Sequence, residues 1–320
     1  MNTIFVIAKK EVKDAFKNRI FDITLLLLFL LTVVSIILGT LQVKVQMDAY
    51  NNSILFLKSI GKSEFPPMPN LNPISVSKSF VNYIGMIGAI LSIILGNYSI
   101  SKEKRSGTLK LILSRPIFRD SFLNGKLFGN LFILLVITIS AEIITFSSLL
   151  ILANIQISAD DFLRLNLFFL MSFLYMSFFF ILSLMFTILI SKENKSILIT
   201  ILVWLMLAFV FPQIGDAMDL DNQLPGGFFA QMGMTRDQEH QILNKFKFYE
   251  TVRDGIEELS PTKHYERVSY ALLNIKPGFE KNTAIEILGL KWVDLSGLTI
   301  PSIILIMLSY GFYLKKENIY

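Results

Sequence analysis

Six long apolar blocks, separated by shorter polar segments, constrain the fold of this chain of 320 residues more than any other feature. Charged residues make up 17% of the chain, whereas a soluble domain has roughly a quarter. A helix needs about 20 apolar residues to cross about 30 Å of hydrocarbon, where the backbone finds no other hydrogen-bond partner. The pattern predicts an all-α integral membrane protein with six transmembrane helices. The predicted spans are 20–41, 80–100, 127–153, 162–190, 196–214 and 292–314.

The distribution of Lys and Arg outside these spans predicts their orientation. Sixteen of these residues fall in about 57 residues formed by 1–19, 101–126, 191–195 and the C-terminal tail. Thirteen fall in about 123 residues on the opposite side. Because basic loops stay in the cytoplasm, both termini and the 101–126 loop are predicted to be cytoplasmic, in the cell membrane. The pI of about 9.2 reflects this bias and does not indicate a nucleic-acid partner.

Four regions follow from this layout. Residues 1–19 form a basic amphipathic stretch that predicts a cytoplasmic interfacial helix. Residues 20–214 hold spans one to five with the coupling loop 101–126, and residues 292–320 hold span six and a cytoplasmic tail. Between them, 215–291 predicts a small helical extracytoplasmic segment: an apolar stripe runs from Ile242 to Leu259, and Ser260-Pro261 supplies an N-cap and first-turn proline for another helix.

Several kinds of chemistry find no support in the sequence. There is no cysteine, and the two histidines, His240 and His264, are expected to be plain surface or cap residues. A soft-metal site of His240 with three methionines (Met218, Met232 and Met234) is the alternative, and it is not favoured. Gly61-Lys62-Ser63 resembles the end of a P-loop, but Phe56 stands where the first glycine is required. No metal or nucleotide is therefore expected on this chain, nor are the motifs of an intramembrane enzyme present.

The 101–126 loop carries the clearest functional signal. Short apolar stretches in it, Leu109 to Leu113 and Ile117 to Leu123, are surrounded by basic residues and broken by Pro116. Exposed apolar groups of this kind suit the docking of a soluble partner. The residues expected to dock or couple such a partner are Glu103, Arg105, Gly107, Thr108, Leu109, Ser114, Arg115, Pro116, Arg119, Gly125 and Lys126.

Here the sequence resembles the type-2 export permeases of ABC transporters, including NosY-like members. The matching pattern is Glu103-x-x-x-Gly107-Thr108-Leu109, then Ser114-x-Pro116, then Gly125-Lys126, directly after the second span. The basic N-terminal helix, the six spans and Leu259-Ser260-Pro261-Thr262 in the external segment agree with that family. The large external segment departs from its smaller members, so its role is not transferred.

The resemblance implies a permease subunit that bears no active site of its own. Residues 1–19 would be the connecting elbow helix, and the 101–126 loop would hold the coupling helix that docks on a separate ABC ATPase. Two copies of that ATPase would bind ATP and Mg, and a second permease copy or a paralogue would complete the transporter. An extracytoplasmic protein is a further candidate partner, and the cargo stays open.

Glu142 supports a different hypothesis. It is the one ionisable side chain predicted well inside a span, in Ser140-Ala-Glu-Ile-Ile-Thr145. An intramembrane carboxylate is costly and is a candidate for the transport path. A proton-coupled secondary transporter could use Glu142 as a relay, although the centres of the other spans offer no partner base. A hydrogen bond that only packs two helices is the structural alternative.

Overall fold

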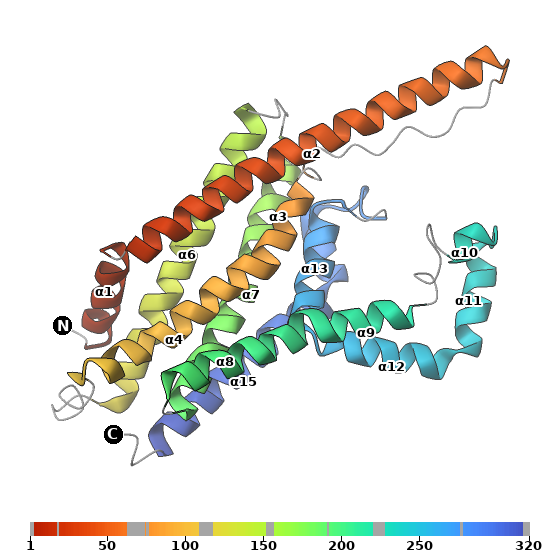
Figure 1. The fold of residues 1–320 in the computed structure, drawn as a ribbon. Helices are drawn as coiled ribbons and strands as arrows, with labels where there is room; N and C mark the ends of the chain where they lie inside the picture. The colour runs from red at the N-terminus through yellow and green to blue at the C-terminus, as the bar shows by residue number, and fades with distance from the viewer. Residues whose placement is uncertain are drawn as a thin grey trace.

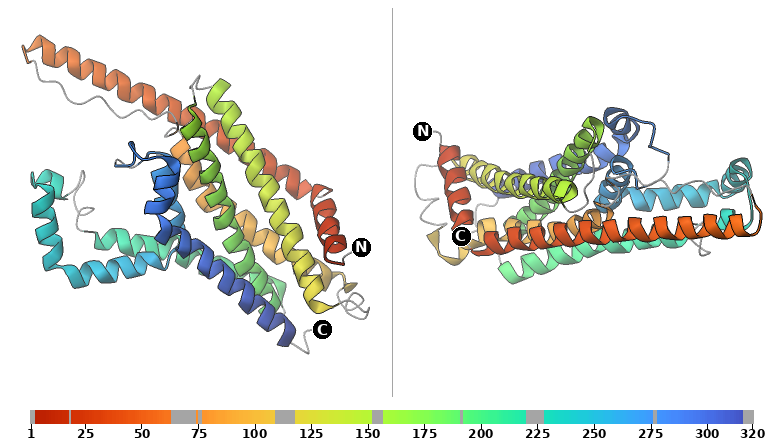
Figure 2. Two further views of the ribbon diagram at one scale, coloured as in Figure 1. Left: turned by 180° about the vertical axis from the view of Figure 1, so that it is seen from behind. Right: turned by 90° about the horizontal axis from the view of Figure 1, so that it is seen from above.

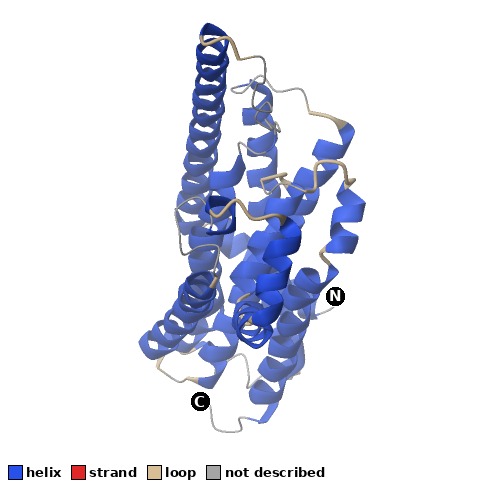
Figure 3. Ribbon diagram, turned by 90° about the vertical axis from the view of Figure 1, so that its right-hand side faces the viewer, coloured by secondary structure: helices blue, strands red, loops and turns tan. Residues whose placement is uncertain are grey.

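The computed structural model describes residues 3–17, 19–62, 74, 77–108, 118–151, 157–190, 192–219, 228–275 and 278–315. Within these ranges the chain forms helices and no strand (Figures 1 and 3). Six helical segments are long and apolar enough to cross a membrane, which confirms the predicted all-α fold with six spans. They are Phe29–Ser59, Lys78–Arg105, Arg119–Ile151, Ala159–Leu189, Asn194–Met218 and Trp292–Lys315.

The chain begins and ends at the same end of the bundle (Figure 1). Helix α1 (Thr3–Phe16), the C-terminal end of α4 (Ala89–Arg105) and the start of α6 (Arg119–Ile151) also lie there, as does the C-terminal end of α15 (Trp292–Lys315). We call this the terminal end. That this end faces the cytoplasm stays a prediction.

Helix α2 (Arg19–Ser59) is longer than the first predicted span. Its 41 residues extend about 60 Å at 1.5 Å per residue, roughly twice the hydrocarbon thickness. The apolar block ends near Leu41, but no glycine or proline follows until Gly61, whose φ is +73°. The loss of hydropathy after Leu41 therefore does not end the helix, which continues to Ser59.

Helix α7 (Ala159–Leu189) is the centre of the bundle. In the most apolar stretch of α7, 78% of the residues are buried, whereas only 11% are buried in the corresponding stretch of α15. It packs against α4, α6, α13 (Pro261–Leu272) and α15. The approach to α4 requires Gly96, where an added Cβ would lie 2.4 Å from the carbonyl oxygen of Phe180. Three spans are poorly covered by the rest of the chain and leave their apolar faces exposed to lipid or to another chain. They are α2, α15 and the span that starts with α8 (Glu193–Leu205).

Two spans contain a π-helical turn. The segment η2 (Ile84–Gly88) separates α3 (Lys78–Tyr83) from α4, and η3 (Met206–Val210) separates α8 from α9 (Phe211–Met218). Pro212 lies in the first turn of α9. Its ring and its missing N–H disturb the preceding turn, which gives a physical reason for η3.

The extracytoplasmic segment predicted at 215–291 is helical. It contains α10 (Phe228–Gln231), α11 (Arg236–Lys245), α12 (Lys247–Glu258), α13 and α14 (Ala284–Leu290). The stripe expected from 242 to 259 is divided at Phe246, whose φ of −104° and ψ of 22° leave the helical region. Figure 2 shows α11 and α12 meeting at an angle, with α12 beside α9.

Helix α13 returns deep into the bundle. As predicted, Ser260 caps it by accepting a hydrogen bond from the backbone N–H of Lys263, and Pro261 follows at the first position. The rings of Tyr265 and Tyr175 stack with centroids 4.5 Å apart. Ser260 donates to the carbonyl oxygen of Leu207 in η3, and Tyr175 donates to that of Gly85 in η2, at 2.6 Å each. The start of α13 thus lies between the two π-helical turns.

Candidate functional site

Helix α1 docks on α6 over two glycines one turn apart. An added Cβ at Gly125 would lie 2.6 Å from the Cβ of Ile7, and one at Gly129 would lie 2.9 Å from the Cβ of Glu11. Both distances are shorter than real Cβ contacts allow. Small residues four apart let two helix backbones approach closely. The predicted amphipathic helix is therefore present, and its partly buried stripe faces α6.

Lys126 lies at the centre of a buried ionic network at the terminal end. Its side chain is 1% exposed, and its Nζ lies 2.8 Å from a carboxylate oxygen of Glu11 and 2.7 Å from one of Glu103. Lys10 adds a contact of 2.9 Å to the same oxygen of Glu103. Because these side chains come from α1, α4 and α6, the network joins the three helices. We call Lys10, Glu11, Glu103 and Lys126 the brace.

A second ion pair lies at the rim of the brace. Lys102 of α4 donates to Asp14 of α1 at 2.6 Å, and both side chains are about one-third exposed (33% and 35%). Partial burial raises the pKa of Asp14, but the hydrogen bond and charge of Lys102 outweigh it and hold the pKa below its ordinary value. The folded carboxylate is therefore ionised to a lower pH than the unfolded one, and its small stabilising contribution is lost only as the pH falls through the lowered pKa.

The structure divides the predicted docking residues into two groups. Glu103, Gly125 and Lys126 are buried against α1, so in this arrangement they hold helices together and do not face outward. Arg105, Gly107, Thr108 and Arg119 are exposed at the terminal end. Gly107 has a φ of +67°, a conformation that favours glycine just after α4 ends. Leu109, Ser114, Arg115 and Pro116 lie outside the described residues, as does most of the predicted coupling helix.

A polar cluster that the sequence did not reveal ties α4 to α7 and α8. The side-chain amide of Asn97 donates to the hydroxyls of Thr187 and Ser196 at 3.1 and 3.3 Å, and these hydroxyls lie 3.0 Å apart. Lys104 donates to the carbonyl oxygen of Thr187 at 2.6 Å. The available signal was Asn97 itself, an amide placed inside an apolar block.

Glu142 lies on α6, far from the brace. It is half-buried between the buried residues Ala141 and Thr145, and it follows Lys126 by sixteen residues, or about 24 Å of helix. No basic side chain pairs with it among the residues that the structure describes. Its predicted place in a transport path stays a prediction.

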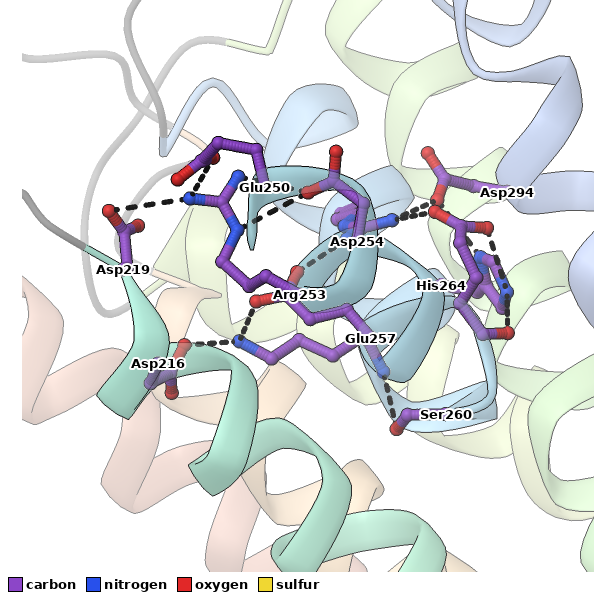
Figure 4. A network of polar contacts seen from close by, with 12 residues as sticks. Asp216, Asp219, Glu250, Arg253, Asp254, Glu257, Ser260, His264 and Asp294 are labelled. Atoms are coloured by element: carbon purple, nitrogen blue, oxygen red, sulfur yellow. Dashed lines mark hydrogen bonds and ion pairs between the residues drawn. The ribbon is translucent and has the colours of Figure 1, made fainter. Parts of the chain in front are cut away.

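A second cluster of charged residues joins α12, α13 and α15 (Figure 4). Arg267 of α13 donates to Glu257 and Glu258 at 2.5 Å each and to Asp294 of α15 at 3.4 Å. Burial lowers the pKa of Arg267, but its hydrogen bonds to Glu258 and Glu257 outweigh this and hold the pKa above its ordinary value. The guanidinium therefore stays charged and links three helices.

His264 belongs to this cluster and is not the surface residue that the sequence suggested. It is 2% exposed, and its Nδ1 and Nε2 lie 3.0 Å from a carboxylate oxygen of Asp294 and the carbonyl oxygen of Glu258. Both ring nitrogens therefore lie within hydrogen-bond distance of an oxygen atom. An added Cβ at Gly297 would lie 2.3 Å from Nε2, so α15 needs glycine here.

Three members of the cluster have the spacing of metal ligands. Candidate ligand atoms of Glu258, His264 and Asp294 lie within 4.8 Å of one another. However, Arg267 already places a positive group against both carboxylates, and His264 uses both nitrogens. The donor set therefore does not fit a cation. His240, part of the alternative soft-metal site, has a side chain outside the described residues.

The six long apolar helices define a multi-pass membrane protein. The chain belongs to the ABC-2 family of transporter proteins, because the model of that family matches residues 5–318. This confirms the coarser part of the resemblance, an ABC-2-type permease and a component of membrane transport. A comparison with curated proteins finds no match.

Proposed function

We propose that this chain is the transmembrane subunit of an ATP-binding-cassette exporter and that a separate ATPase docks on its terminal end. Two copies of that ATPase would bind ATP and Mg, and this chain would bind neither. The terminal end would face the cytoplasm, as the density of Lys and Arg indicates. A second permease copy, or a paralogue, would pack on the poorly covered spans. The work done could be export of a solute or the transmission of force to an extracytoplasmic partner.

The observation that carries this proposal is the position of the brace. A motion applied to the docking loop reaches the spans only if the loop is rigidly attached to them. Lys126 connects the last turn of α4, the first turns of α6 and the elbow helix α1, and these elements flank the 101–126 loop. The brace would therefore make the loop and two spans move as one body, as a rigid-body transition requires.

Reversing two exposed charges tests the docking surface. In Arg105→Glu/Arg119→Glu, two bases that flank the loop become acids, and association with the ATPase is expected to weaken about tenfold or more, or ~1.4 kcal/mol. The measurement is the amount of ATPase that co-purifies with the tagged chain from native membranes at increasing salt.

Lys195→Glu is the matched control for this experiment. Lys195 is exposed in the first turn of α8, at the same end of the bundle but outside the 101–126 loop. Its reversal should leave the co-purified ATPase unchanged. Equal recovery of ATPase with the double variant and the control would contradict docking through this loop.

Glu142→Gln separates the exporter from the proton-coupled alternative. Glutamine keeps the size of the side chain but cannot release a proton. If ATP drives transport, the variant is expected to retain ATPase activity stimulated by this chain, within about a factor of two to three (~0.5 kcal/mol). A loss of proton-dependent flux in the variant, with no ATPase bound to the unmodified chain, would favour the secondary transporter.

A further inference from the structure

Helix α2 extends well past the rest of the bundle (Figures 1 and 2). Its last buried residue is Gly39, and among residues 41–62, all of which the structure describes, none is buried. The helix nevertheless continues without a break to Ser59. We call residues 42–60 the extension. A single helix of about this length is marginal in water, because most helical stability in proteins comes from packing an apolar face. The extension is therefore expected to have a partner.

One face of the extension carries an exposed and mainly apolar stripe. The stripe consists of residues at steps of four, three and four, which is the spacing of a coiled-coil seam: Val45, Ala49, Asn52 and Phe56. All four are exposed, Val45 at 65% and Phe56 at 64%. Large apolar groups that are exposed together on one face indicate an interaction surface. We call these four residues the seam.

Lipid is not the expected occupant of the seam. The apolar block 20–41 is already long enough to cross the hydrocarbon. The extension that follows this block has three charged residues on its surface, Lys44, Asp48 and Lys58. Charged side chains are costly inside a bilayer. The extension therefore lies outside the hydrocarbon, where only water or protein can contact the seam.

We infer that the seam packs against the same seam of a second copy of the chain, so that the two extensions form a short parallel coiled coil outside the bilayer. Two copies inserted in the same orientation are related by a two-fold axis along the membrane normal, which places equivalent residues opposite each other. The inference rests on the proposed function only because it requires that second copy.

The residues that flank the seam fit this pairing. In a parallel coiled coil, a flanking residue of one helix faces the residue five positions later on the other helix. Asp48 therefore faces Ser53 of the second copy, so no like charges meet. Leu55 faces Ile60 of the second copy, and these apolar side chains, which are 64% and 52% exposed in the single chain, cover each other. Asn52 lies in the seam itself, and a polar group at such a position fixes the register of the two helices.

Disulfide formation between copies tests this pairing, because the chain has no cysteine of its own. The single variants Val45→Cys, Ala49→Cys and Phe56→Cys each place a thiol in the seam. Lys44→Cys and Asn51→Cys are the controls, at positions that are also exposed but lie on other faces of the extension. Native membrane vesicles that contain the full-length chain are oxidised with copper phenanthroline, and linked dimers are quantified on non-reducing gels. Two cysteines can be joined only where their Cα atoms approach within about 7 Å.

The seam variants are expected to form several-fold more linked dimer than the controls. In the same membranes, co-purification of two differently tagged copies of the unmodified chain is measured. If the copies co-purify but seam and control thiols are linked to equal extents or not at all, the inference is wrong and the proposed two-copy permease stands. If the copies do not co-purify, the inference is also wrong, and only a paralogue could complete the transporter. Linkage of the seam thiols to a different protein would overturn the inference in favour of an extracytoplasmic partner.

Discussion

Replacing Lys126 with methionine is expected to destabilise the folded chain by about 3–5 kcal/mol, the usual cost of removing one partner from a buried ion pair. Lys126 is 1% exposed and lies between Glu11 and Glu103, which are 7% and 2% exposed. Methionine fills much of the same volume but leaves two buried carboxylates without the cation between them. The measurement is the denaturant midpoint of the purified chain in detergent micelles, alongside recovery of the ATPase from membranes.

Two further variants show whether charge or packing is responsible. Neutralising the partners as well, in Lys126→Met/Glu11→Gln/Glu103→Gln, should recover most of the lost stability, because a buried polar group costs far less than an unpaired charge. Lys102→Met removes only the half-exposed pair with Asp14 and should cost no more than about 1 kcal/mol. If Lys126→Met unfolds at the same denaturant concentration as the unmodified chain, the brace does not stabilise this end of the molecule.

Gly125→Leu is expected to release α1 from α6. A Cβ at this position would lie 2.6 Å from Cβ of Ile7 and 3.1 Å from the carbonyl oxygen of Ile4. The second contact is with backbone, so the clash cannot be relieved by turning a side chain, and overpacking of this kind costs about 1–3 kcal/mol. A loss of ~1.4 kcal/mol in the free energy of docking α1 on α6 would raise the rate of amide hydrogen exchange in α1 about tenfold. Because Lys10 and Glu11 belong to α1, the brace should open as well.

Gly311→Leu provides the control for this substitution. Gly311 lies on α15, and an added Cβ there meets nothing within 4 Å. Hydrogen exchange in α1 should be unchanged in this variant, and the chain should keep its full stability. Protection of α1 that is equal in Gly125→Leu and Gly311→Leu would show that the elbow helix does not depend on the close approach to α6.

The predicted docking motif combines residues that are buried between helices with residues that are exposed. The spacing of Glu103, Gly107, Gly125 and Lys126 was informative, but it did not distinguish the residues that hold the loop from those that can face a partner. Glu103 and Lys126 are separated by more than twenty residues, and only the packing of α1 and α4 against α6 brings Glu11 and Glu103 to Lys126. Arg105 and Arg119 stay exposed and keep the role of docking candidates.

The sequence by itself determined the class of the molecule. In a lipid bilayer a long apolar block can satisfy its backbone hydrogen bonds only by forming a helix, so six blocks were sufficient to predict six spans. Ser260-Pro261 was sufficient to predict the start of α13. These predictions depend on interactions between near neighbours in the chain and on the bilayer. They require no knowledge of which helices meet.

Only the tertiary structure decided which polar groups became buried and what they contact. The sequence did not predict that His264 is buried, because its burial depends on the packing of α13 against Asp294 and Gly297 of α15. Glu257 of α12 is covered by Gly215 of α9 and paired with Arg267 of α13, and neither contact can be foreseen from its neighbours in the chain. The physical reason is the same in both cases: the cost of burying a charge depends on its partner, and that partner lies on another helix, far away in the sequence.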